Sequence, residues 1–275
     1  MKRITVTDLS IPELDIFARL REPQLHHYYE PAPGLFLAEG DRVAERALDA
    51  GYEPLAVLAE DRLIDTRFQE LINRCGDIPV YAAPFDVIRE LTGYSLTGGF
   101  LCAMHRKELP PVEQICAGAD RIAILERVTN PTNIGAIVRS AAALRVGAVL
   151  FTGDSCDPLC RRAIRVSMGT IFQIPWTVIP DDWPSEGLRR IRDLGFQTVA
   201  MALTEDTKDL GDPSLHFGKR AALLFGAEGD GLSPETIAAC DLAVKIPMRE
   251  GIDSLNVAAA SAVAFWEFLR DEYQN

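Results

Sequence analysis

The 275-residue sequence contains no apolar run of the about 18 residues that a membrane-spanning helix needs. The first residues, MKRITVTDLSIPELD, also lack the apolar core of a signal peptide. Apolar residues make up 48% and charged residues 25% of the chain, proportions that are ordinary for a globular protein. These features predict a cytoplasmic protein without membrane association, and its length is sufficient for two compact domains.

Residues that bind metals are few and are not clustered. The six cysteines are scattered, and the closest pair, Cys156 and Cys160, has no second pair nearby to complete a zinc site. We therefore interpret the cysteines as small, reduced core residues and predict no metal. None of the four histidines has the spacing of a metal ligand, and we interpret them as structural or surface residues. They are His26, His27, His105 and His216.

Two common nucleotide-binding motifs are absent as well. The glycine-rich segment LLFGAEGDGLSPE lacks the Gly-Lys-Ser/Thr ending of a Walker A loop. Its glycine order, G-x-x-G-x-G, and its late position also differ from the dinucleotide fingerprint. A nicotinamide-dependent oxidoreductase is therefore disfavoured, since the chain has neither an N-terminal glycine fingerprint nor an obvious ribose-binding acid after it.

The net charge of −12 argues against a generally RNA-binding surface, because phosphates favour basic partners. The charge is uneven, however: residues 121–165 contain only the acids Glu126, Asp154 and Asp157 against seven arginines. Such a patch is compatible with an RNA site, although surface arginines are more often simply solvated. The arginines are Arg121, Arg127, Arg139, Arg145, Arg161, Arg162 and Arg165.

Strand-like and helix-like segments alternate along most of the chain, which predicts a mostly parallel sheet covered on both faces. Charge, a proline pair and lost periodicity interrupt the pattern and predict a linker at residues 106–118 between domains 1–105 and 119–275. In the first part, we predict helices at 40–51, 66–76 and 84–93 and strands at 53–60, 78–83 and 99–104. In the second, we predict strands at 121–128, 148–153, 175–179, 196–203, 221–226 and 242–248 and helices at 133–145, 157–169, 185–195, 233–241 and 254–273.

Ligands of such sheets bind beyond the carboxyl ends of the strands, and three segments place unusual residues there. The first, TNPTNIGAIVRSA, has Asn133 near a helix start and Arg139 about 9 Å farther along the axis. The second is the glycine-rich segment around Gly226, whose glycines allow close approach of a ligand. The third, KIPMREGIDSLNV, brings Ser254 and Asn256 to the start of the last helix. Each has an ordinary explanation as a cap, a turn or a solvated side chain.

Together and in this order, N-x-G-x-x-x-R-S-A, F-G-A-E-G-x-G-L and I-P-M…S-L-N-V resemble the three motifs of the SpoU (TrmH-like) methyltransferases of the SPOUT superfamily. The resemblance covers residues 120–272 and includes RVSMGTIFQIPW. PAPGLFLAEGDRVAERALDAG resembles the small α/β substrate-binding domain that often precedes this catalytic domain. The resemblance implies an α/β protein whose C-terminal parallel-sheet domain carries a deep trefoil knot, following an RNA-binding domain, and a homodimer formed through the knotted domain.

The resemblance also implies that S-adenosylmethionine is bound among the knot loops, largely by main-chain groups. One departure from the family pattern is Gly251, which lies one place later than the glycine of many members, so we expect altered loop detail rather than a lost site. The residues that correspond to the cofactor loops are Leu203, Thr204, Gly226, Ala227, Glu228, Gly229, Ile246, Met248, Ser254, Leu255 and Asn256.

The implied reaction is methyl transfer to a ribose 2′-hydroxyl of structured rRNA or tRNA, and a base atom as acceptor stays open. The family assigns a catalytic role to the position of Arg139, but a guanidinium is a poor base. We therefore expect it to grip the neighbouring phosphate, with phosphate-assisted proton transfer as an alternative. Asn133 and Asn256 would bind ribose or phosphate, and Glu228 is a candidate for holding Arg139 or Asn133 in place. The implied catalytic set is Asn133, Arg139, Glu228, Ser254 and Asn256.

A non-catalytic RNA-binding or assembly protein that kept the fold is the main alternative. The intact set of motif residues argues against it, and cofactor binding would separate the two hypotheses.

Overall fold

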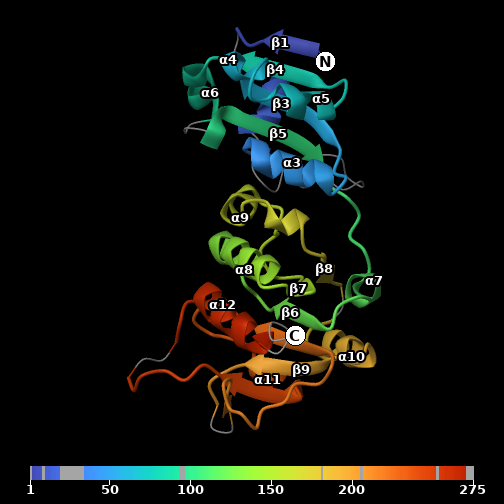
Figure 1. Ribbon diagram of the computed structural model, residues 1–275, viewed down its shortest axis with the longest axis vertical. Helices are drawn as coiled ribbons and strands as arrows, with labels where there is room; N and C mark the ends of the chain where they lie inside the picture. The colour runs from blue at the N-terminus through green and yellow to red at the C-terminus, as the bar shows by residue number, and fades with distance from the viewer. Residues whose placement is uncertain are drawn as a thin grey trace. The chain divides into compact units, whose positions relative to one another are not determined.

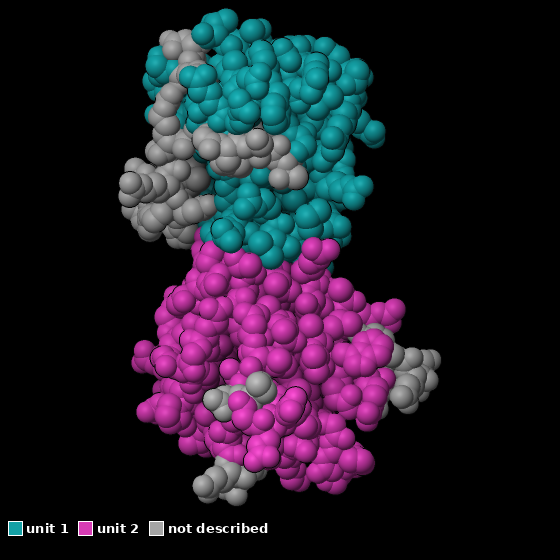
Figure 2. All heavy atoms as spheres, turned by 90° about the vertical axis from the view of Figure 1, so that its left-hand side faces the viewer, with its two compact units in different colours: residues 1–108, 159–173 teal, residues 109–158, 174–275 magenta. Residues whose placement is uncertain are grey.

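A computed structural model describes residues 2–7, 10–18, 34–92, 97–180, 182–204, 207–251 and 254–270. These residues form two compact units, one made of residues 1–108 and 159–173 and the other of residues 109–158 and 174–275 (Figure 2). In the described ranges, no helix is both long and apolar enough to cross a membrane. His26 and His27 lie outside the described residues.

The first unit is built on a five-stranded sheet in the order β1-β4-β3-β5-β2 (Figure 1). β1, β4 and β3 are parallel, whereas β5 runs antiparallel to both of its neighbours. The strands are β1 (Lys2–Thr5), β2 (Leu35–Glu39), β3 (Pro54–Glu60), β4 (Pro79–Ala83) and β5 (Phe100–His105). The helices are η1 (Pro12–Leu14), α1 (Asp15–Ala18), α3 (Asp41–Asp49), α4 (Asp61–Ile64), α5 (Gln69–Arg74), α6 (Phe85–Thr92), η2 (Thr97–Gly99), α9 (Arg161–Val166) and η3 (Thr170–Phe172).

The second unit is built on a seven-stranded sheet in the order β10-β12-β9-β11-β6-β7-β8. Every neighbouring pair is parallel, which confirms the predicted parallel sheet. The strands are β6 (Arg121–Leu125), β7 (Ala148–Thr152), β8 (Trp176–Ile179), β9 (Gln197–Met201), β10 (Lys208–Asp209), β11 (Ala221–Phe225) and β12 (Leu242–Lys245). The helices are α7 (Val112–Cys116), α8 (Pro131–Ala143), α10 (Ser185–Asp193), α11 (Pro234–Ala239) and α12 (Val257–Phe268).

The central strands β7 and β11 are buried over their whole length, and β6 is buried after its first residue, Arg121, as expected for apolar strands in a sheet covered on both faces. Helix α8 begins where sequence chemistry places it: Asn130 accepts a hydrogen bond from the Thr132 N–H at 2.9 Å, and Pro131 occupies the first turn. The buried side of α8, which includes Ile134, Ile137 and Val138, faces the core.

Two parts of the predicted division differ from the structure. The expected linker at 106–118 includes α7, whose Val112 and Cys116 are buried in the core of the second unit. Residues 159–173, predicted within the second domain, pack in the first unit, where Phe172 stacks against Phe36. The chain therefore passes between the two units at three points rather than through one linker.

Candidate cofactor pocket and catalytic site

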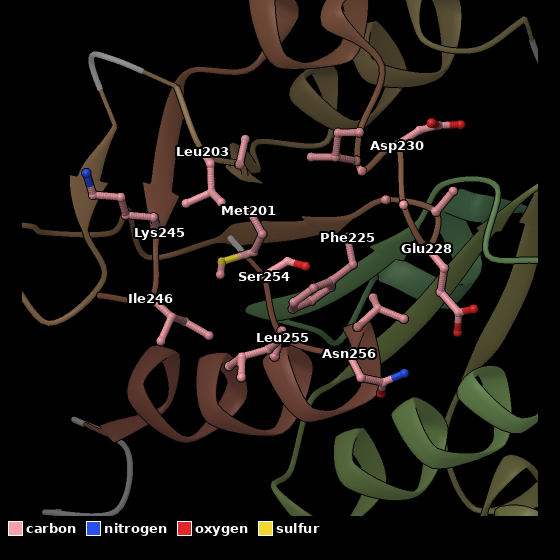
Figure 3. Close-up of a pocket in the computed structure, with 18 of the residues that line it drawn as sticks. Met201, Leu203, Phe225, Glu228, Asp230, Lys245, Ile246, Ser254, Leu255 and Asn256 are labelled. Carbon is pink, nitrogen blue, oxygen red and sulfur yellow. The ribbon is translucent and has the colours of Figure 1, made fainter. Parts of the chain in front are cut away.

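A pocket of about 540 Å³ lies at the carboxyl ends of three neighbouring strands, β12, β9 and β11 (Figure 3). Its volume is within the range of about 300–1,000 Å³ that is typical of small-molecule sites. The walls come from the loops after these strands and from the start of α12. Of the predicted cofactor residues, ten line the pocket: Leu203, Gly226, Ala227, Glu228, Gly229, Ile246, Met248, Ser254, Leu255 and Asn256.

Thr204, the eleventh predicted residue, is not among the lining residues. Its N–H donates to Thr207 Oγ1 at 2.9 Å, and the two hydroxyls are 2.6 Å apart. Thr204 therefore belongs to a local turn that shapes the loop after β9, while the neighbouring Leu203 side chain projects at the pocket (Figure 3).

The glycine loop after β11 folds back on itself. Ala227 and Gly231 exchange two backbone hydrogen bonds of 3.1 and 3.0 Å, so the loop returns across its own start. A Cβ atom on the buried Gly226 would lie 2.0 Å from the Leu232 nitrogen, which no side chain could tolerate. Gly229 and Gly231 have φ angles of 88° and 69°, in the left-handed region that glycine adopts without strain. The loop thus requires glycine because of its own backbone, before any ligand is considered.

Asn256 connects the pocket to α8. Its Oδ1 accepts the Ala258 N–H at 3.0 Å and so caps α12, while its Nδ2 donates to Asn133 Oδ1 at 3.2 Å. The ordinary interpretation as a helix cap is correct for Asn256, but it describes only one end of the amide. Ser254 lies exposed in the loop before the helix and lines the pocket.

Asn133 is buried and is released from capping because Asn130 performs that role. Its Nδ2 is buried without a hydrogen-bond partner among the described residues. A buried donor without a partner is costly, and such groups in native structures call for an explanation such as a ligand or a bound water. The amide is therefore held by Asn256 at one atom and has an unused donor at the other.

Arg139 and Glu228 are exposed. Within the part of the chain that the structure describes, neither side chain forms an ion pair or hydrogen bond, so the expected contact of Glu228 with Arg139 or Asn133 is not formed. The reason is local: Asn133 is already engaged by Asn256, and Glu228 lies in the exposed part of the glycine loop. Arg139 lies six residues beyond Asn133 on α8, and its side chain is exposed.

Sequence reasoning missed Glu126, which is buried directly after β6 and accepts hydrogen bonds from Trp183, Ser233 and Thr236. The signal that could have pointed to it is an acidic residue directly after the apolar run IAIL of β6. Arg127, the next residue, has a φ of 51°, a left-handed conformation that is uncommon for a residue other than glycine.

The six cysteines are buried or half-buried. Burial raises the pKa of the Cys116 thiol to about 11 and that of the Cys240 thiol to about 12. Both stay protonated at neutral pH and contribute to packing rather than to nucleophilic chemistry. Across the described ranges, no group of three or more histidine, cysteine or acidic side chains is arranged to hold a metal ion.

Comparison with known proteins matches this site to one family. The SpoU rRNA Methylase family profile covers residues 120–266. The uncharacterized tRNA/rRNA methyltransferase Mb0905 of Mycobacterium bovis is 39% identical over 96% of this chain and 91% of the relative. The 23S rRNA (uridine(2479)-2′-O)-methyltransferase of Streptomyces viridochromogenes is 28% identical over 86% of this chain and 83% of that protein.

Among solved structures, the AdoMet-bound rRNA methyltransferase from Sinorhizobium meliloti superposes with a TM-score of 0.82 at 25% identity and covers 98% of each chain. The SpoU methyltransferase AviRb from Streptomyces viridochromogenes superposes with a TM-score of 0.78 at 25% identity over 95% of this chain and 96% of that one. The three sequence motifs and these similarities establish that the chain belongs to the SpoU rRNA methylase family.

Proposed function

We propose that this protein transfers a methyl group from S-adenosylmethionine to a ribose 2′-hydroxyl in structured RNA, either rRNA or tRNA. The observation that carries the proposal is the pocket at β12, β9 and β11, which collects ten of the eleven predicted cofactor residues and is joined to α8 through Asn256 and Asn133. Relatives named as 2′-O-methyltransferases and AdoMet-bound neighbours support the same chemistry. The proposal also includes a cytoplasmic location, which is consistent with an rRNA or tRNA substrate.

The residues present fit S-adenosylmethionine. The pocket walls combine apolar side chains, such as Leu203, Ile246 and Leu255, with the exposed backbone of the glycine loop. An adenosine ring suits the apolar walls, and loop N–H and carbonyl groups suit its polar edges. The bound cofactor supplies an activated methyl group on its sulfonium, and the protein therefore has to position the weak ribose nucleophile and manage its proton.

Asn133 and Arg139 perform the positioning in this proposal. The unused Nδ2 of Asn133 is a donor for a ribose or phosphate oxygen once local movement exposes it. Arg139, exposed and unengaged within the described residues, offers a two-pronged donor to the phosphate next to the reacting ribose. Glu228, on the pocket rim, would approach these groups only through movement of the glycine loop, and Ser254 borders the space where cofactor and ribose meet.

The first unit recruits the RNA in this proposal. It has its own sheet and core, and it includes the arginine-bearing helix α9. Deleting residues 1–108 would not test this idea cleanly, because residues 159–173 would lose the partners that bury Ile164 and Ile171. Point variants of exposed side chains in the full-length protein, such as Arg162→Ala, are therefore the appropriate probes.

The proposal also includes a homodimer formed through the second unit and the deep trefoil knot that the family resemblance implies. Supporting the dimer, α12 carries no charged residue from Val257 to Trp266, and Val263 and Trp266 on its surface are 47% and 56% exposed. A second copy of the chain would cover this uncharged face. Sedimentation should give a dimer that Val263→Asp converts to monomer, and a wild-type monomer at micromolar concentration would overturn the dimer.

The deciding experiment for the activity is single-turnover methylation with isotope-labelled S-adenosylmethionine, followed by nucleoside analysis of the RNA. Arg139→Ala should lower the rate at least about 100-fold with cofactor affinity nearly intact, equivalent to about 2.7 kcal/mol. Arg139→Lys should recover little, because a point charge does not reproduce the planar grip on phosphate. Arg189→Ala, at an exposed arginine of α10 in the same unit, is the matched control.

Rates for both Arg139 variants within about threefold of wild type, under about 0.7 kcal/mol, would refute the assigned role. Binding of RNA without binding of S-adenosylmethionine would favour the non-catalytic alternative.

A further inference from the structure

The carboxylate of Glu126 is the centre of a buried hydrogen-bond cluster. Its side chain is 1% exposed, and its Oε1 accepts the Ser233 N–H at 2.9 Å. Its Oε2 accepts the Trp183 indole N–H at 2.7 Å and the Thr236 hydroxyl at 2.5 Å. The Arg127 Nε lies 3.6 Å from Oε1, which supplies a nearby positive charge. Three donors therefore converge on one buried carboxylate.

Glu126 contacts both ends of the glycine loop, through its backbone at the start of the loop and through its carboxylate at the end. At its start, the Glu126 N–H donates to the carbonyl of Phe225 at 2.8 Å, directly before Gly226. At its end, Ser233 follows the pocket-lining Leu232, and Thr236 precedes the pocket-lining Ile237. A single residue thus fixes where residues 226–232 leave β11 and where they enter α11.

We propose that Glu126 is a positioning residue for the cofactor pocket: it acts through Ser233 and Thr236 to hold the glycine loop in its cofactor-binding conformation. This inference rests on the proposed function, because it takes S-adenosylmethionine as the ligand of the pocket. Buried hydrogen bonds to an ionised group are stronger than neutral ones, so the cluster is suited to fixing a loop that is otherwise exposed between Glu228 and Asp230. The remaining walls of the pocket do not depend on it.

The chemistry of the cluster predicts which substitution breaks it. The Ser233 N–H and the Trp183 indole N–H are obligatory donors, one on each carboxylate oxygen. Glu126→Gln keeps the size of the side chain, but its amide nitrogen must face one of these two donors. One end of the cluster therefore loses its bond whichever way the amide is turned.

The test is calorimetric affinity for S-adenosylmethionine together with steady-state kinetics on the full-length protein. Glu126→Gln should raise the Kd and the cofactor KM at least about 10-fold, while kcat at saturating cofactor stays within about threefold of wild type. Thr236→Val, which removes one donor, should raise the Kd in the same direction, and Thr236→Ser, which keeps the hydroxyl, should restore it. The Thr236 pair keeps the proposal testable if Glu126→Gln fails to fold.

Glu60→Gln is the matched control, since Glu60 is a carboxylate with 4% exposure at the end of β3 in the first unit. It should change thermal stability without changing the Kd. Wild-type affinity in both Glu126→Gln and Thr236→Val would overturn the positioning role, as would an equal loss in Glu60→Gln. Failure of the wild-type protein to bind S-adenosylmethionine would overturn the proposed function itself, and so the two failures are distinguishable.

Discussion

Asn256 performs two tasks with two different atoms, and this allows stability and catalysis to be separated at one position. Its Oδ1 caps α12 through the Ala258 N–H, and its Nδ2 holds Asn133. Asn256→Ala removes both interactions. Asn256→Ser keeps a capping oxygen, because serine is as good an N-cap as asparagine, but it is too short to reach Asn133.

The two variants should therefore differ in stability but not in activity. Loss of a cap costs about 1 kcal/mol, so the alanine variant should melt about 2–4 °C below the serine variant. Both variants leave the Asn133 amide without its partner in a buried site, a cost of about 1–3 kcal/mol. If that cost falls on the transition state, both should lose about 5- to 150-fold in the single-turnover methylation rate.

Thermal melting and single-turnover assays on the same preparations measure the two effects. Recovery of wild-type activity by Asn256→Ser would show that the residue matters only as a cap. Wild-type activity in both variants would refute any role of the Asn256–Asn133 contact in the reaction.

Three further predictions follow from the pocket and the core. Ala260 lines the pocket, so Ala260→Leu should weaken S-adenosylmethionine binding at least about 10-fold in calorimetry. Ala259→Leu, on the exposed side of the same helix, should leave the affinity unchanged. Equal effects of the two substitutions would mean that the ligand binds elsewhere. Gly226→Val should lower the unfolding free energy by about 3 kcal/mol or more, because the added Cβ would meet the Leu232 backbone. Gly229→Ala should lower it by only about 1–2 kcal/mol, because a Cβ added there would have no neighbouring atom within 4 Å. Equal melting temperatures of the two variants would contradict this. Because burial raises the pKa of Cys116 to about 11 and that of Cys240 to about 12, both remain thiols at pH 8; native alkylation followed by peptide mass spectrometry should find both largely unmodified, and rapid labelling would contradict the raised pKa values.

The Gly226 prediction corrects the simplest interpretation of a glycine motif. A glycine-rich loop suggests room for a ligand, and from sequence alone a valine at Gly226 would be expected to collide with cofactor. In the structure the collision is with residues 231–232 of the same loop. Loss of cofactor binding in Gly226→Val would therefore not identify a ligand contact, and the Ala260 and Ala259 pair is the better probe.

Periodic segments were predictable because their burial is decided locally. Helix α3 was predicted at 40–51 and occupies Asp41–Asp49, with Val43, Ala44 and Ala47 on its buried side and Gly51 in a left-handed turn just beyond it. The final helix begins three residues later than predicted because Asn256 caps it, and residues 271–273 of that prediction lie outside the described residues. The strands of the second sheet are mostly apolar and were all predicted except β10, which has only two residues, Lys208 and Asp209.

Elements that depend on distant partners were not predictable in the same way. Strands β1 and β2 were missed: β1 is a short, largely exposed edge strand, and β2 is defined by antiparallel pairing with β5, which lies more than 60 residues away. The placement of residues 159–173 in the first unit depends on side chains far away in the sequence. Arg161 pairs with the buried Glu39 at 3.2 Å, and Phe172 packs on Phe36 and Tyr52.

The site follows the same division between local and distant information. Its loops were predicted because glycine, proline and capping residues mark where parallel strands end, and a parallel sheet brings those ends to one edge. Glu126 was not predicted, since its three donors come from segments 57 to 110 residues away and nothing near it in sequence reveals them. The motif residues identify the chemistry, whereas the group that holds their loop in place is visible only after folding. Residues proposed to act on the RNA and residues that fix the cofactor loop therefore have to be tested by different measurements, rate for Arg139 and cofactor affinity for Glu126.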